Sequence, residues 1–168
     1  MTNKVKRLYF YTTATLLSAL AVALVLIALD EIFKIDNRHT EFYAPARKHD
    51  FCMYMDGAFY ELSLRQKHHV FSTALDSLDA QILYTMVLKP ILNIQDLRND
   101  ARIAYGKGKN NMIAVKERVD KGEFAVGFSM LPATVEEIKA IADEGLRMPP
   151  KSTYIEPKLR SGITIYEF

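Results

Sequence analysis

Cations and hydroxyl groups are concentrated in a proline-rich stretch near the carboxyl end of the chain, residues 148–162. Its three prolines and its glycine exclude a continuous helix, so the stretch must run extended or turned. Ammonium and hydroxyl groups both donate hydrogen bonds to anions. We take four of these side chains as candidate anion ligands: Lys151, Ser152, Thr153 and Lys158. The stretch predicts binding of a phosphate or a carboxylate; the alternative is a solvated connector before a last strand.

A glycine-rich loop earlier in the chain has a similar character. Gly106, Lys107 and Gly108 follow a predicted short strand at residues 102–105 and precede a predicted helix that begins near Asn111. A strand, a glycine loop and a helix start can present backbone N–H groups and two lysines, Lys107 and Lys109, to a phosphate. The spacing matches neither the P-loop nor the dinucleotide-binding fingerprint, so a flexible connector is the alternative. We predict one anion site that joins both loops.

Other kinds of catalytic or metal site are not predicted. Cys52 is the single cysteine, which permits neither a thiolate metal cluster nor an internal disulfide. His68 and His69 are adjacent, and neighbouring side chains on an extended chain point to opposite sides. Asp143 and Glu156 lie close to the anion loop in sequence, but an exposed helix position and a proline-bounded turn explain them more simply. We therefore assign no catalytic residue, no metal ligand and no cofactor.

Composition and charge are those of a globular domain. Of 168 residues, 49% are hydrophobic and 25% are charged, which argues against disorder. The formal net charge is only +2, whereas a dedicated nucleic-acid binder usually shows a basic stripe. The length suits one domain with an ordinary core. Nucleic acid is therefore not an expected partner.

An uncharged run near the amino end, residues 8–29, has two interpretations. At about 1.5 Å per residue it could cross a hydrocarbon core of about 30 Å as a single-pass anchor. Its wholly apolar part, residues 16–29 apart from Ser18, is short and more typical of a buried helix. Cations on both sides leave the orientation of a span open: Lys4, Lys6 and Arg7 against Lys34, Arg38, Arg47 and Lys48.

Strand and turn signals follow the apolar run. Residues 36–50 are polar, contain Pro45 and are predicted to form a linker. Alternating residues on either side of Asp56 and Gly57 predict a β-hairpin over residues 51–64, because this dipeptide tolerates the positive φ angles of a tight turn. Residues 123–131 predict a central strand with small side chains on one face, which would let a helix or a ligand come close.

Three helices are predicted from capping signals. The first runs from a Ser77 cap to about residue 89, with Asp79 favoured in its first turn by the helix dipole. The second covers residues 111–121 and ends at Gly122. The third begins with a Thr134–Glu137 capping box and closes near residue 145. Together these elements predict an α/β fold: a small layered domain with a mixed sheet at residues 51–168, a linker at 36–50, and an N-terminal apolar helix at 1–35.

Several segments resemble the family known as domain of unknown function 1015. The proline-rich stretch, together with residues 142–145 before it, resembles the C-terminal signature of that family. The resemblance covers roughly residues 42–168, the last third of a typical member, and includes residues 53–57, 77–79, 90–98, 118–120 and 126–131. It implies a cytoplasmic α/β protein.

The N-terminal part of family members resembles ParB-like free-serine kinases and carries an Asp-Gly-His-His-Arg motif. This chain departs from that pattern, because Asp56-Gly57 and His68-His69 are separate. The resemblance therefore implies a fragment-like chain, with a truncated or frame-shifted start and a missing N-terminal part that could be encoded separately.

These observations lead to two functional hypotheses. The first is an anion-binding or phosphometabolite-binding module without independent activity, in a cytoplasmic domain that residues 8–29 could tether to a membrane. The alternative is the substrate-binding part of a kinase acting on free serine or a similar small hydroxyl metabolite. Only this alternative requires ATP and Mg²⁺, because phosphoryl transfer needs a nucleotide and a metal to balance its charge.

Overall fold

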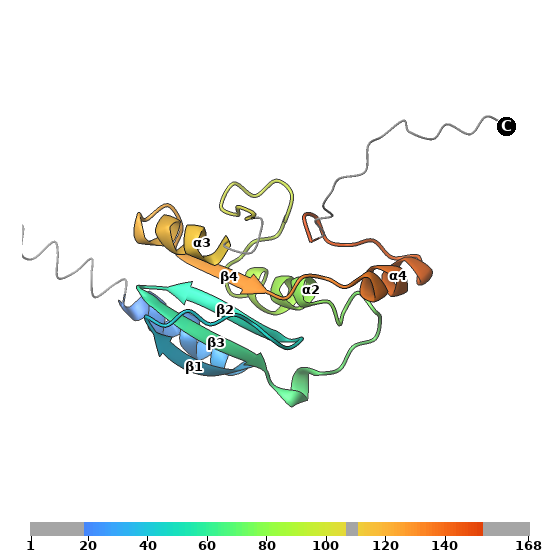
Figure 1. Cartoon of the computed structure of the whole chain (residues 1–168), viewed down its shortest axis with the longest axis horizontal. Coiled ribbons are helices and arrows are strands. Elements are labelled where there is room, and N and C mark those ends of the chain that lie inside the picture. Colours follow the sequence, from blue (N-terminus) through green and yellow to red (C-terminus); the bar gives the residue numbers. More distant parts are fainter. Residues whose placement is uncertain (1–18, 107–110, 153–168) are drawn as a thin grey trace, which may run out of the picture.

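A four-stranded antiparallel sheet organises the domain (Figure 1). The computed structural model describes residues 19–106 and 111–152. The strands are β1 (Phe33–His39), β2 (Asp50–Met55), β3 (Ala58–Leu64) and β4 (Val126–Met130). Their order is β1-β3-β2-β4, and all three pairings are antiparallel. The predicted α/β class is confirmed. The sheet was predicted to be mixed, with residues 123–131 as a central strand. In the structure β4 runs antiparallel to β2 and lies at the edge of the sheet.

The hairpin predicted around Asp56 and Gly57 is confirmed. Both residues have positive φ angles, 49° and 79°, as a tight two-residue turn requires. β2 and β3 then pair in the register that this turn sets, with Met55 opposite Ala58 and Asp50 opposite Ser63. Every residue of β2 is buried, so this strand is covered on both faces.

β1 lies where a helix end and a linker were predicted. A helix over residues 19–30 ends in a turn in which the Ile32 N–H donates to the Leu29 carbonyl. The chain then enters β1, with Phe33 paired to Leu64 and Ile35 to Leu62. Phe33 and Ile35 alternate with exposed Lys34. An alternation with a period of two is typical of a strand, and pairing with β3 stabilises the strand at this position.

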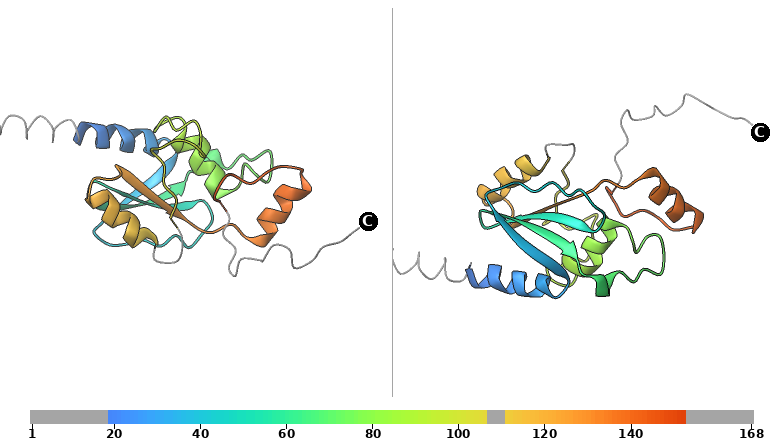
Figure 2. Two further views of the ribbon diagram at one scale, coloured as in Figure 1. Left: turned by 90° about the horizontal axis from the view of Figure 1, so that it is seen from above. Right: turned by 60° about the horizontal axis from the view of Figure 1, so that its bottom comes forward.

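Helices cover both faces of the sheet (Figure 2). The helix over residues 19–30 and α2 (Asp79–Leu83), which continues as a π-helical segment (Tyr84–Leu88), pack on the larger core. On the other face, α3 (Asn111–Asp120) contributes Met112, Val115 and Val119 to a second core around Cys52 and Tyr54. α4 (Val135–Asp143) follows β4. The sheet is thus the middle of three layers.

The helix over residues 19–30 has one packed face and one exposed face. Leu29 is fully buried, whereas Leu24 is 58% exposed. Val22, Val25 and Leu26 also pack against the larger core. Of the helices in residues 19–106 and 111–152, none combines the length and apolarity needed to cross a bilayer.

The predicted helix ends are partly correct. The Thr134–Glu137 capping box of α4 is confirmed, and Gly122 and Gly145 adopt positive φ angles after α3 and α4. The predicted cap at Ser77 is wrong: α2 begins after Leu78, and the Ser77 hydroxyl donates to the Ala74 carbonyl. Residues 102–105 do not form the short strand predicted there. They belong to a loop that its own side chains hold together.

Candidate functional site

A pocket of about 430 Å³ lies between the loop after the π-helical segment and the turn after α4. Among the described residues that line it, four are apolar or aromatic and two are cations: Leu97, Ile103, Tyr105 and Pro150, with Arg98 and Lys151. The loop and the turn form the two walls of the pocket and are about fifty residues apart in the sequence. Lys151 in the turn was a predicted anion ligand, and the loop ends directly before Gly106, another predicted ligand.

The turn after α4 places Lys151 at this pocket. The Ser152 N–H donates to the Pro149 carbonyl across 3.3 Å, and the Ser152 hydroxyl donates to the same oxygen across 2.6 Å. Pro150 and Lys151 are the central residues of this turn. Lys151 has a φ of +59°, a conformation in which glycine is usual and a lysine costs roughly 1–2 kcal/mol. Backbone strain of this kind is concentrated at functional sites.

The opposite wall is an irregular loop stabilised by two side-chain links. Arg102 donates to Asp100 across 2.9 Å and to the Asn93 carbonyl across 2.7 Å. The hydrogen bonds from Arg102 lower the pKa of Asp100 to about 2. The Tyr105 hydroxyl donates to the Leu97 carbonyl across 2.7 Å. These bonds fix the wall where no helix or strand does so.

Asp96 stabilises the start of the same loop. Its carboxylate accepts the Arg98 N–H at 2.7 Å and the Asn99 side-chain amide at 2.7 Å. The backbone bond from Arg98 is the largest cause that holds the pKa of Asp96 below its usual value. The carboxylate is therefore occupied by backbone and amide donors, and the Arg98 guanidinium is not among its hydrogen-bond donors.

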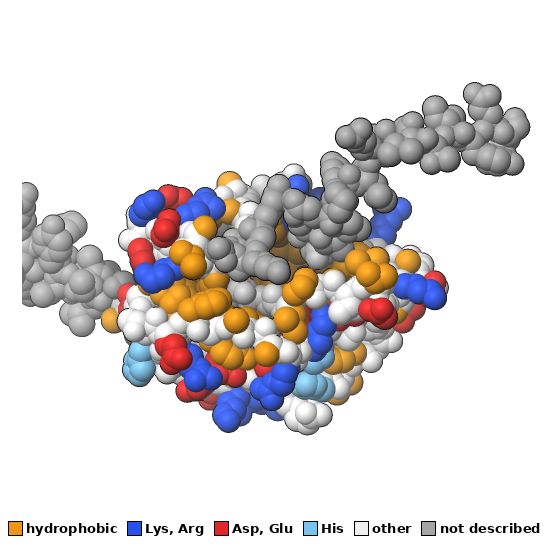
Figure 3. Space-filling model, viewed as in Figure 1, with side chains coloured by type: hydrophobic (Ala, Val, Ile, Leu, Met, Phe, Trp, Pro, Cys, Tyr) orange, Lys and Arg blue, Asp and Glu red, His pale blue; other side chains and the backbone are white. Residues whose placement is uncertain are grey.

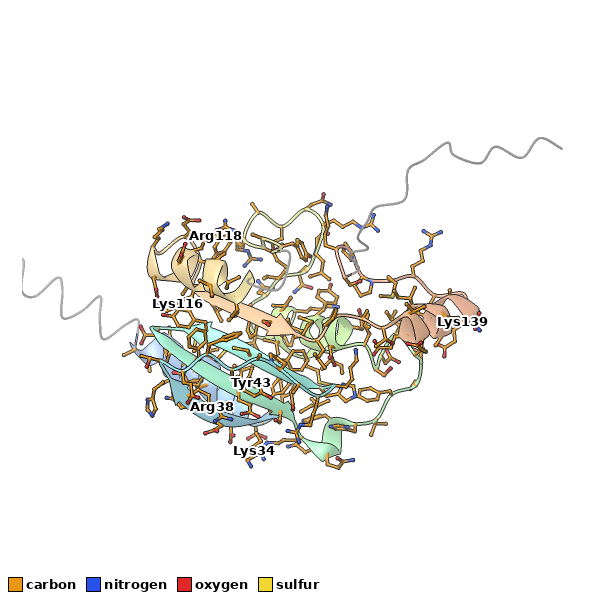
Figure 4. The ribbon with its side chains drawn as sticks, viewed as in Figure 1. Lys34, Arg38, Tyr43, Lys116, Arg118 and Lys139 are labelled. Atoms are coloured by element: carbon orange, nitrogen blue, oxygen red, sulfur yellow. The ribbon has the colours of Figure 1, made fainter. Side chains whose placement is uncertain are left out.

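The two cations of the pocket differ from most other cations of the described residues. Arg118 pairs with Glu123 at 2.8 Å, Lys116 pairs with Asp120, and Arg38 pairs with Glu61. Arg38 lies on β1, whereas Lys116 and Arg118 both lie on α3 (Figure 4). Cations and carboxylates are interspersed on the face seen in Figure 3. Within residues 19–106 and 111–152, Arg98 and Lys151 form no ion pair with a carboxylate.

The predicted site residues divide into two groups. Lys151 lines the pocket, Ser152 belongs to the same turn, and Gly106 is an exposed residue directly after Tyr105. Lys107, Gly108, Thr153 and Lys158 lie outside the described residues.

Sequence reasoning missed Arg98 and Tyr105 as pocket residues. Arg98 falls in a charged segment, residues 96–100, from which no ligand was predicted. Tyr105 is the residue before the glycine loop, where it was assigned to a strand. The signal that could have found them is a cation and an aromatic residue flanking a loop already suspected of binding anions.

A second cluster of polar groups surrounds Asp79. The residue lies in the first turn of α2, as predicted, and it is only 1% exposed. Its Oδ1 accepts the His49 N–H at 3.0 Å and lies 3.0 Å from His49 Nδ1. Its Oδ2 is buried without a hydrogen-bond partner among the described residues. Burial is the largest cause that raises the pKa of Asp79 above its ordinary 3.8.

This cluster predicts an unusual dependence of stability on pH. The folded protein holds the Asp79 proton more tightly than the unfolded chain, so the contribution of this group falls as pH rises from 3.8 through the folded pKa. We expect the stability of Asp79→Asn relative to the wild-type protein to rise between about pH 4.5 and about pH 7.5, because only the wild-type protein loses this contribution. Denaturant unfolding of both proteins at both pH values measures this. Asp79→Ala should destabilise, because both His49 donors lose their acceptor. A stability difference between the wild-type protein and Asp79→Asn that does not change with pH would contradict the argument.

The histidines and the cysteine have structural contacts. His68 Nε2 lies 3.1 Å from the Glu31 carbonyl, and His69 Nε2 lies 3.1 Å from the Leu64 carbonyl. Cys52 is buried in β2, and burial raises the pKa of its thiol to about 11. Among the described residues, no three histidine, cysteine or acidic side chains are grouped so that they could hold a metal ion. The pocket is therefore the stronger candidate, because it combines a cavity with two cations that form no ion pair with a carboxylate among the described residues.

Comparison of the chain with protein-family models, with curated proteins and with solved structures found no match. The candidate site must therefore be judged on its own chemistry.

Proposed function

We propose that this chain is a binding module for a small anionic metabolite, which occupies the pocket between residues 97–105 and the turn at residues 149–152. The observation that carries the proposal is that Arg98 and Lys151, two cations without a carboxylate partner among the described residues, line the same cavity. A carboxylate or phosphate placed between them would receive charge-assisted hydrogen bonds from both walls.

The strained backbone at Lys151 and the fixed walls of the pocket support the same function. Lys151 occupies a left-handed position that glycine would adopt without strain, and the turn fixes it there with two bonds to Pro149. The opposite wall uses Arg102 and Asp100 to hold an irregular loop in place. Preorganised walls reduce the ordering cost of binding, so modest contacts can still give useful affinity.

The resemblance to the domain of unknown function 1015 family is part of the proposal. The stretch that carries its C-terminal signature begins at Met148 and therefore supplies the turn with Lys151. Under this proposal the module has no activity of its own, and a separately encoded N-terminal part would be needed for catalysis. Positioning both reactants is a large part of an enzyme's rate, and half a site cannot provide it.

Calorimetric titration with inorganic phosphate at low ionic strength tests the proposal. We expect binding that weakens about fivefold to tenfold in Arg98→Gln and in Lys151→Gln, because each change removes one charge-assisted contact worth about 1 kcal/mol at a partly exposed site. Added salt should weaken binding to the wild-type protein as well, since exposed charges are screened.

Arg118→Gln is the matched control. It removes the same charge from α3, where Arg118 is already paired with Glu123. We expect phosphate affinity to stay unchanged in this variant. The proposal fails if the wild-type protein gives no binding heat, or if Arg118→Gln weakens binding as much as the pocket variants do.

A further inference from the structure

The walls of the pocket carry more information than its two cations. Among the described residues, Leu97, Ile103, Tyr105 and Pro150 contribute most of the lining, and none of the described lining residues is a carboxylate. A site for a bare anion would be expected to surround its ligand with donors. The described residues offer donors at two positions and apolar surface elsewhere, which is the pattern of a pocket that orients a ligand by a few polar contacts and binds its body by burial.

The hydroxyl and the ring of Tyr105 differ in what they can offer a ligand. Its hydroxyl is engaged with the Leu97 carbonyl at 2.7 Å, so its hydrogen is not available to a ligand. The residue can therefore offer a ligand its ring but not its hydroxyl proton. Aromatic rings bind other rings and apolar groups more favourably than area alone would give. Pro150 and Ile103 provide further apolar surface at the same cavity.

The size of the cavity agrees with this chemistry. A volume of about 430 Å³ falls within the range that takes ligands with a ring or a branched body, roughly 300–1,000 Å³. A phosphate ion or a three-carbon phosphoester would fill a small part of it and leave the apolar wall in contact with water. Burying apolar surface gives binding energy that such small ligands cannot use.

From these observations we infer that the ligand is an amphipathic anion: a phosphate or carboxylate group attached to an aromatic or similarly bulky apolar body. The anionic group lies between Arg98 and Lys151, and the body lies against Tyr105, Leu97 and Ile103. This inference rests on the proposed function and narrows it, because it disfavours a hydroxyl amino acid or its phosphoester as the best ligand of this pocket.

Titrations with three probes test the inference: inorganic phosphate, phosphoserine and phenyl phosphate. We expect phenyl phosphate to bind about tenfold tighter than the other two, because partial burial of one ring is worth about that factor. Tyr105→Ser should abolish this preference. Tyr105→Phe keeps the ring without the hydroxyl, so the preference should remain.

The outcomes separate the inference from the proposed function. If all three probes bind with equal affinity, and Arg98→Gln weakens all of them, anion binding stands and the apolar body is wrong. If phenyl phosphate binds tightest but Arg98→Gln has no effect, the ring is bound outside this pocket and the inference fails. If no probe binds, the proposed function fails together with the inference. A thermal unfolding scan of Tyr105→Ser, compared with Tyr105→Phe, checks that the wall is still folded.

Discussion

Leu29→Ala is expected to lower the free energy of unfolding by about 2–5 kcal/mol, the range for a leucine removed from a packed core. Leu29 is fully buried at the end of the helix over residues 19–30 and belongs to the same core as Phe33 and Phe51. Alanine would leave a cavity that the surrounding sheet can fill only by moving. Denaturant unfolding followed by circular dichroism measures the change.

Leu24→Ala is the matched control for this prediction. The same substitution is made in the same helix, but the Leu24 side chain is 58% exposed. We expect a change within about 0.5 kcal/mol, as for other surface positions. Equal effects of the two substitutions would show that this helix does not pack on the sheet as the structure has it.

Gly127→Ala is expected to destabilise the protein by about 1–3 kcal/mol through overpacking. Gly127 lies in β4 opposite Tyr54, and a Cβ at this position would collide with Cγ1 of Val115 on α3. The clash, and not backbone strain, is the cause, because the strand conformation suits alanine. The sequence predicted a close approach to the small-residue face of this strand, and α3 is the element that makes it.

A double-mutant cycle isolates the clash. In a Val115→Ala background the methyl groups that obstruct residue 127 are gone, so the alanine at 127 should cost less than about 0.5 kcal/mol. Chemical denaturation of the wild-type protein, both single variants and the double variant gives the coupling energy. An unchanged cost in the double variant would mean that α3 does not approach β4 at this glycine.

One wall of the candidate site could be predicted because it is a single short stretch of sequence, the turn that carries Lys151. A stretch with prolines, lysine and hydroxyls cannot be helical, and this alone indicated the turn that carries Lys151. Its partner in the pocket, Arg98, stands in a charged turn whose sequence is equally compatible with a solvated connector. The distance between Arg98 and Lys151 depends on how the loop after the π-helical segment folds back. The spacing of these residues in the sequence does not predict that distance.

The amino-acid sequence by itself determined three local features: the hairpin at Asp56-Gly57, the capping box at Thr134 and the small-residue face of β4. These depend on φ and ψ preferences and on side chains within a few residues of each other. Tertiary structure alone decided three other features. β1 formed because β3 offered a partner, Asp79 was buried because His49, thirty residues away, came to lie beside it, and Arg98 joined Lys151 at one cavity. Pairing, burial and convergence are properties of the folded chain, since they depend on contacts between residues that the sequence keeps far apart.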